Sequence, residues 1–166
     1  MGSTVHPVVE SLPPLLLDAC RSHYGDRLIA LALFGSVGRG TAGPESDVDL
    51  FLVASPLPDG RIARAAEFET VERALNPWLD EAHRAGLAPR FSPVFKTPEE
   101  LAHGTPLLLD MIDDARILTD ERGELRRALE RLRSRLETLG ARRLWRGNAW
   151  VWDLKPDYRP GEIFEL

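Results

Sequence analysis

The sequence predicts an α/β fold, because short apolar runs typical of strands alternate along the chain with longer segments of helical periodicity. Its 166 residues, 43% of them hydrophobic, are enough to build one packed core. We therefore expect a single domain over residues 1–166. Its core should cover about residues 10–120, followed by a C-terminal helix at about 121–139 and an aromatic tail at 144–166.

The first half of the chain should form a helix, two buried strands and a second helical segment. Apolar residues spaced by three and four positions predict a helix from about Pro7 or Ser11 to Tyr24, which should end at Gly25. Two apolar runs follow, and they have the length and composition of strands. The expected elements after the first helix are a strand at 28–34, a strand at 47–54, and a helical segment at 61–85 that Asn76-Pro77 should bend or divide.

The second half should begin with a strand and end with a charged helix and an aromatic tail. Thr97-Pro98-Glu99-Glu100 has the pattern of a capping box with proline in the first turn, so a short helix should begin there. Leucines repeat at three and four positions in the last helix, where they pack either on the core or on a partner. The expected elements are a strand at 90–96, the capped helix, a helix at 107–112, a short strand at 115–118 and the helix at 121–139.

A glycine-rich loop follows the first predicted strand. Gly35, Gly38 and Gly40 allow positive φ angles and close approach of the backbone. Ser36 adds a hydroxyl and an amide at the start of a helical turn, where anions bind readily. The loop can therefore cradle a polyphosphate, although a tight turn between a strand and a helix would use the same residues.

Two aspartates lie two positions apart at the start of the second predicted strand. Val48, Leu50 and Leu52 alternate with Asp47 and Asp49, so one face of the strand is apolar and both carboxylates lie on the other. Two neighbouring carboxylates repel each other, and a bound cation would offset that repulsion. Such a pair on its own is also typical of an exposed strand face. Its place about ten residues after the glycine loop favours a joint site for phosphate and metal.

The two motifs together, Gly-Ser-x-x-Arg-Gly and Ser-Asp-x-Asp-Leu, resemble the signature of the DNA polymerase β-like nucleotidyltransferase superfamily, and above all its small stand-alone members. This resemblance implies a small mixed sheet of about four strands, with helices mainly on one face. It implies that Gly35 and Ser36 hold the triphosphate of an NTP, with ATP expected, and that Asp47 and Asp49 hold Mg²⁺. The implied reaction is transfer of a nucleoside monophosphate to a hydroxyl of a small molecule or protein, with loss of pyrophosphate.

Arg39, the basic residue of the loop, has two interpretations. It either neutralises phosphate, and so joins Gly35 and Ser36 in the predicted phosphate-binding set, or it pairs with an acid such as Asp47 or Glu45 to brace the loop. The sequence leaves both open.

Active members of the superfamily usually place a third carboxylate on a later strand, and the strand expected at 90–96 contains no acid. Lys96 on that strand could contact phosphate or offset the negative charge of Asp47 and Asp49, although an exposed lysine at the end of a strand is the more general interpretation. The substitutes considered for the third carboxylate, none in a fitting context, are Asp110, Asp113, Asp114 and Asp120. The alternative function is therefore a nucleotide-binding or protein-binding module of weak or no activity, similar to an antitoxin, with a helical protein or a second copy as its partner.

Composition narrows the function further. A net charge of −5 argues against broad nucleic-acid binding, and the apolar runs are too short for a membrane span. Without a signal-peptide pattern, we expect a cytoplasmic protein.

Cys20 lies among leucines and should be a buried, inert thiol. Three of the four tryptophans lie in the tail, which should be anchored on the domain, a sheet edge or another subunit, with base stacking by Trp150 or Trp152 as the alternative.

Overall fold

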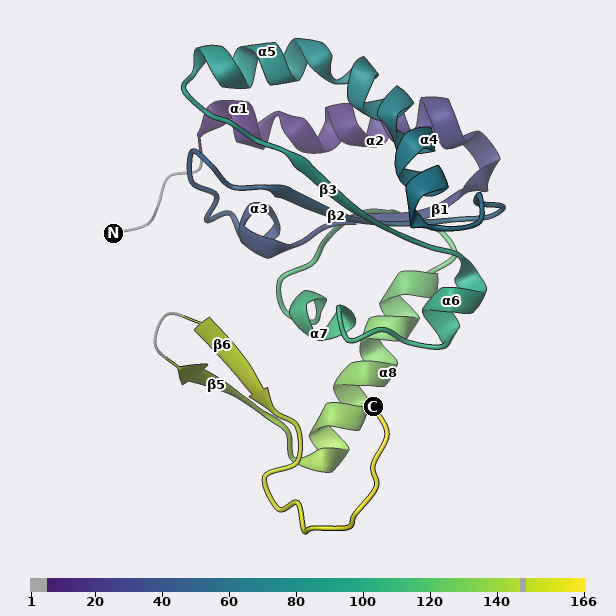
Figure 1. Cartoon of the computed structure of the whole chain (residues 1–166), viewed down its shortest axis with the longest axis vertical. Helices are drawn as coiled ribbons and strands as arrows, with labels where there is room; N and C mark the ends of the chain where they lie inside the picture. The colour runs from purple at the N-terminus through teal and green to yellow at the C-terminus, as the bar shows by residue number, and fades with distance from the viewer. Residues whose placement is uncertain (1–5, 147–148) are drawn as a thin grey trace.

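The computed structural model describes residues 6–146 and 149–166, and Figure 1 shows their arrangement. Helices and strands alternate through most of the chain, as the sequence predicts. The elements in chain order are α1 (Pro7–Glu10), α2 (Leu12–Tyr24), the 3₁₀ turn η1 (Gly25–Arg27), β1 (Leu28–Leu33), α3 (Gly35–Arg39), β2 (Val48–Ala54), α4 (Arg61–Ala74), α5 (Asn76–Arg84), β3 (Phe91–Lys96), α6 (Pro98–Ala102), α7 (Leu108–Met111), β4 (Arg116–Asp120), α8 (Glu124–Leu139), β5 (Arg142–Arg146) and β6 (Ala149–Asp153).

Four strands form one mixed sheet in the order β3-β2-β1-β4. β1 runs antiparallel to both β2 and β4, whereas β2 and β3 are parallel. The expected mixed sheet of four strands is therefore confirmed. Its two central strands, β1 and β2, are almost wholly buried, which explains why both are continuous apolar runs in the sequence.

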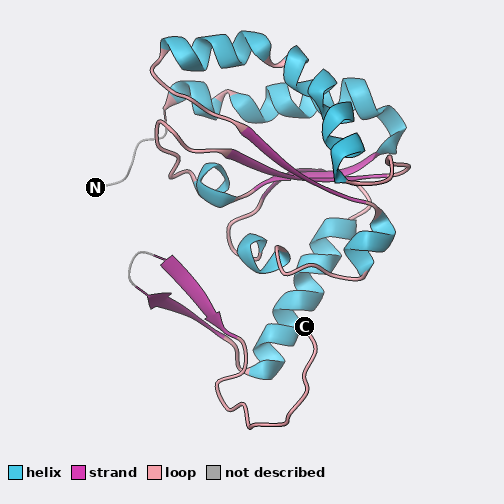
Figure 2. Ribbon diagram, in the orientation of Figure 1, coloured by secondary structure: helices cyan, strands magenta, loops and turns pink. Residues whose placement is uncertain are grey.

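Helices cover both faces of this sheet (Figure 2). Four helices, α1, α2, α4 and α5, lie on one face, and a second layer of α6, α7 and α8 lies on the other (Figure 1). Alternate residues of β1 and β2 face the two layers: Leu31 and Leu50 join one hydrophobic cluster, and Ala32 and Phe51 join the other. The sheet thus has a packed core on each side.

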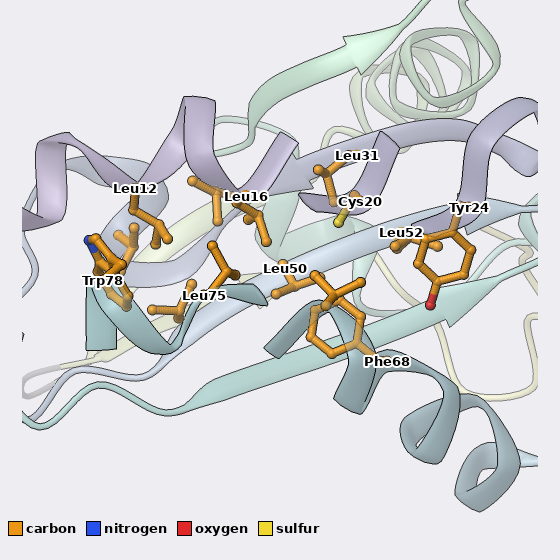
Figure 3. Close-up of a cluster of buried hydrophobic side chains, with 14 of the residues drawn as sticks. Leu12, Leu16, Cys20, Tyr24, Leu31, Leu50, Leu52, Phe68, Leu75 and Trp78 are labelled. Atoms are coloured by element: carbon orange, nitrogen blue, oxygen red, sulfur yellow. The ribbon is translucent and has the colours of Figure 1, made fainter. Parts of the chain in front are cut away.

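The larger cluster holds α2, α4 and α5 against the sheet (Figure 3). Leu16 and Cys20 from α2 meet Phe68 from α4, and all three side chains are fully buried. Burial of one such leucine contributes about 1.5–3 kcal/mol. The indole Nε1 of Trp78 donates a hydrogen bond to the Val8 carbonyl at 2.8 Å, so α5 is also tied to α1. The predicted buried thiol of Cys20 is confirmed.

Local signals set most of the helix boundaries. The helical segment divides at Asn76-Pro77 into α4 and α5, and the Thr97–Glu100 capping box opens α6. The last helix begins at Glu124, three residues later than expected. The buried carboxylate of Asp120 accepts hydrogen bonds from the amides of Leu125 and Arg126, so Asp120 ends β4 and caps α8.

The tail differs most from its expected form. β5 and β6 pair antiparallel as a hairpin that follows α8 and is separate from the main sheet (Figure 1). Trp152 and Leu154 pack against the cluster formed by α6, α7 and α8, so the tail is anchored on the domain. Trp145 and Trp150 remain about half exposed.

In the part of the chain that the structure describes, no helix combines the length and apolar character needed to cross a bilayer.

Candidate active site

The backbone of the glycine loop closely approaches the carboxylate of Asp49. β1 ends at Leu33, and the Phe34 amide donates a hydrogen bond of 3.0 Å to the Asp49 carbonyl on β2. Gly35 has a φ of +62°, and a Cβ added there would overlap the Oδ2 atom of Asp49. Only glycine satisfies both conditions, since a side chain would be strained and would displace the carboxylate.

Two further glycines fix the short helix α3. A Cβ at Gly38 would lie 2.9 Å from the Leu33 carbonyl oxygen and 2.7 Å from that of Asp114, so α3 packs tightly between the two backbones. Gly40 ends the helix in the left-handed conformation, with a φ of 72°. The first amides of a helix have no partner within it, and Phe34 supplies no side-chain cap. The amides of the Gly35-Ser36 turn are therefore free to receive an anion.

The structure brings both predicted aspartates to this end of the sheet. Asp47 is exposed immediately before β2, and Asp49 is half buried on the strand itself. Burial raises the pKa of Asp49 above its usual range, and the negative charge of Asp47 raises it further. A hydrogen bond from the Ser92 side chain and the positive charge of Arg39 lower that pKa in part.

This pair fits a divalent cation chemically. Carboxylate oxygens are the ligands that Mg²⁺ prefers, and a cation would offset both the burial of Asp49 and its repulsion by Asp47. Across residues 6–146 and 149–166, no three His, Cys, Asp or Glu side chains form a group that could hold a metal by themselves. Water or substrate oxygens would therefore complete the coordination of a bound ion.

Ser92 occupies the β3 position beside Asp49. The parallel register pairs these two residues, and the serine side chain lowers the pKa of the carboxylate. The acid-free strand expected from the sequence is thus adjacent to the site. Lys96, by contrast, pairs with Val53, four residues further along β3 and about 13 Å away. This position agrees better with an exposed lysine at the end of the strand than with a phosphate contact, which stays a prediction.

The four distant aspartates considered as substitutes lie elsewhere. Asp120 caps α8, and Asp110 is exposed on α7. Asp113 and Asp114 lie at the junction between α7 and β4 and take part in ion pairs with arginines. None of them forms a three-residue cluster with Asp47 and Asp49 in the described part of the chain.

Arg39 braces the loop in this structure. Its Nη1 atom lies 3.1 Å from Oδ2 of Asp114, which Arg143 of β5 also contacts. The sequence could not assign Asp114 or Arg143 to this cluster, because they lie 75 positions and more from Arg39 and no local pattern marks them. A contact between Arg39 and phosphate stays a prediction.

Comparison with known proteins gives consistent results. The family model described as "Nucleotidyltransferase domain" matches residues 14–118. A curated relative from Methanocaldococcus jannaschii, named "Putative protein adenylyltransferase MJ1305", is 33% identical over 119 residues, which cover 70% of this chain and 76% of the relative.

Two solved structures share the fold. A toxin–antitoxin crystallised with AMP-PNP has a TM-score of 0.54 at 19% identity. The match covers 77% of this chain and 89% of the chain in that structure. A mutant of the toxin–antitoxin MntA-HpeT has a TM-score of 0.52 at 16% identity, covering 76% and 88%. The family match extends over more than half of the chain and contains the glycine loop and both aspartates. The chain therefore belongs to the nucleotidyltransferase family, whose members are transferases of nucleoside monophosphates.

Proposed function

We propose that this protein transfers AMP from ATP to a hydroxyl group of a protein, with Mg²⁺ bound at Asp47 and Asp49. The observation that carries the proposal is the close approach of the Asp49 carboxylate to Gly35, which leaves no room there for a Cβ atom. It supports the proposal because nucleotidyl transfer needs phosphate and metal sites side by side, and these are the roles proposed for this turn and this carboxylate. ATP and a protein acceptor are chosen because the relative from Methanocaldococcus jannaschii is named a protein adenylyltransferase.

Each residue of the candidate site has a proposed role in the reaction. The amides of Gly35 and Ser36 bind the β and γ phosphates, and Arg39 organises the loop through Asp114 before the nucleotide binds. Asp47 and Asp49 would hold Mg²⁺, which would supply positive charge to orient the acceptor and neutralise the leaving group. The acceptor oxygen forms a bond to the α phosphorus as the bond from that phosphorus to the bridging oxygen breaks, and pyrophosphate departs. The proton of the hydroxyl passes to water, because the residue beside Asp49 on β3 is a serine.

The setting of the reaction follows from these substrates. We expect the protein to act in the cytoplasm, where ATP and Mg²⁺ are both available. A second copy of the chain or a helical protein stays the expected partner. Light scattering of the purified protein, alone and with a candidate acceptor, tests this expectation.

The test of the proposed function is calorimetric titration of ATP, GTP, CTP and UTP with Mg²⁺, followed by mass spectrometry of candidate acceptors. The key variants are Asp47→Asn and Asp49→Asn, and Asp80→Asn on α5 is a matched control at an exposed carboxylate. We expect ATP binding that requires Mg²⁺, with transfer abolished in the two key variants and kept in the control. Transfer by a folded Asp49→Asn protein would remove the metal assignment.

A second candidate function is nucleotide binding without transfer, in a module similar to an antitoxin. The observation that favours it is the hydroxyl of Ser92 at the position beside Asp49 where active relatives usually have a carboxylate. The variant Ser92→Asp separates the two functions. If the wild type binds ATP but adenylylates nothing and the variant gains transfer, the wild-type protein is a binding module.

A further inference from the structure

A chain of ion pairs connects the glycine loop to the C-terminal hairpin. Arg39 of α3 and Arg143 of β5 approach the same oxygen, Oδ2 of Asp114, each at 3.1 Å. Arg143 also lies 3.4 Å from Asp113, which in turn lies 3.5 Å from Arg133 of α8. Five charged side chains thus extend from the proposed phosphate-binding helix to the part of the chain that follows the family match at 14–118.

Asp114 is the most buried member of this group. Its side chain is 12% exposed, compared with 23% for Arg143 and 42% for Arg39. A carboxylate so deeply placed is costly to leave without a partner. Arg39, the more exposed of its two partners, is the one with more freedom to leave.

The position of Arg39 on α3 gives it access to a bound triphosphate. Arg39 follows Gly35 by four residues, so the two share a face of the helix, about 6 Å apart along its axis. Helical side chains lean toward the N-terminus, and Gly35 has no side chain to block the path. The arginine side chain is long enough to span this distance and place its guanidinium beside phosphate at the turn.

We propose that Arg143 is a positioning residue for nucleotide binding: it keeps Asp114 paired when Arg39 leaves that carboxylate to contact the triphosphate. The inference rests on the proposed function, because it requires ATP at the Gly35-Ser36 turn. With Arg143 present, departure of Arg39 leaves no buried charge alone. Without Arg143, the same movement leaves the Asp114 carboxylate without a partner. The free energy of that loss then weakens ATP binding.

The hairpin fixes Arg143 in the required place. The Trp150 ring of β6 lies 4.9 Å from the guanidinium carbon of Arg143, and Trp145 packs against Trp150 at 4.3 Å between ring centroids. Arg143 is the register partner of Trp152, which is anchored in the cluster of α6, α7 and α8. The aromatic tail thereby acquires a role in the site, since it orients the arginine that balances Asp114.

The experiment is titration of ATP with excess Mg²⁺ into the full chain and its variants, with folding checked by circular dichroism. We expect Arg143→Ala to weaken ATP binding about tenfold. The matched control is Arg142→Ala, which removes the exposed arginine next to it on β5 and should leave binding unchanged. The double variant Arg143→Ala, Asp114→Asn should recover ATP affinity, because no charge is then left behind when Arg39 moves.

The recovery separates charge balance from simple support of the fold. If the double variant binds ATP as weakly as Arg143→Ala, the arginine acts only by packing the hairpin, and the inference is overturned. It is also overturned if Arg143→Ala binds ATP as tightly as the wild type. Failure of the wild-type protein itself to bind ATP with Mg²⁺ would reject the proposed function, and this inference with it, before any variant is compared.

Discussion

Substitution of Gly35 by alanine tests how closely the proposed phosphate loop and the carboxylate of Asp49 are coupled. An alanine at a φ of +62° costs about 1–2 kcal/mol. Its Cβ would also overlap Oδ2 of Asp49 and lie 3.2 Å from Cγ, and such overpacking typically costs about 1–3 kcal/mol. We therefore expect Gly35→Ala to lower the free energy of unfolding by about 2–5 kcal/mol and to abolish ATP binding.

The measurement is urea unfolding followed by circular dichroism at 25 °C. Gly140→Ala is the matched control, because Gly140 ends α8 at a φ of 66° with open space where the Cβ would go. That variant should lose only about 1–2 kcal/mol. The double variant Gly35→Ala, Asp49→Ala removes the overlapping carboxylate and should be about as stable as the control. The reasoning is refuted if Gly35→Ala loses no more stability than Gly140→Ala, or if removing Asp49 recovers nothing.

Three other predictions follow from ionisable groups. Asp49→Asn should stabilise the metal-free protein at pH 7 and lose this advantage toward pH 3: the raised pKa of Asp49 means that its ionisation opposes folding, which thermal unfolding across pH would show. Glu100→Gln should cost on the order of 1 kcal/mol at pH 7, because the Arg64 hydrogen bond holds the pKa of Glu100 at about 2 but its side chain is 39% exposed. That cost should fade as pH drops from about 4.5 toward 2, and a constant cost would contradict it. Burial raises the pKa of Cys20 to about 12, so a thiol reagent at pH 8 should react only when the chain unfolds; rapid labelling of folded protein would oppose this.

The strands and most helices could be predicted from the sequence because their signals are local. The apolar run at 28–34 and the alternation around Asp47 and Asp49 define strands through neighbouring residues alone. The Thr97–Glu100 capping box and the Asn76-Pro77 break set helix boundaries in the same way. The late start of α8 was missed, since its cap comes from Asp120 at the end of β4.

The candidate site was predictable only in its own short segment. The glycine loop and the two aspartates are separated by few residues, so the strand–loop–strand order already placed them together. Ser92 could be named as lying on an acid-free strand, but its position beside Asp49 depends on the parallel register of β2 and β3. The hairpin of the tail was not predicted although its strands are neighbours in sequence, because the proline, glycine and tryptophan content indicated an irregular anchored segment.

By itself, the sequence determined the mixed α/β architecture, the candidate phosphate-binding turn and the two candidate metal-binding aspartates. The tertiary structure alone decided that Arg39 and Arg143 both contact Asp114, and that Lys96 lies far from the site. The reason is physical: periodicity and turn chemistry act between neighbours, whereas strand register and ion pairing depend on how distant segments pack. Arg39 and Arg143 are separated by more than a hundred residues, and only the packing of α3 and β5 around Asp114 brings them together.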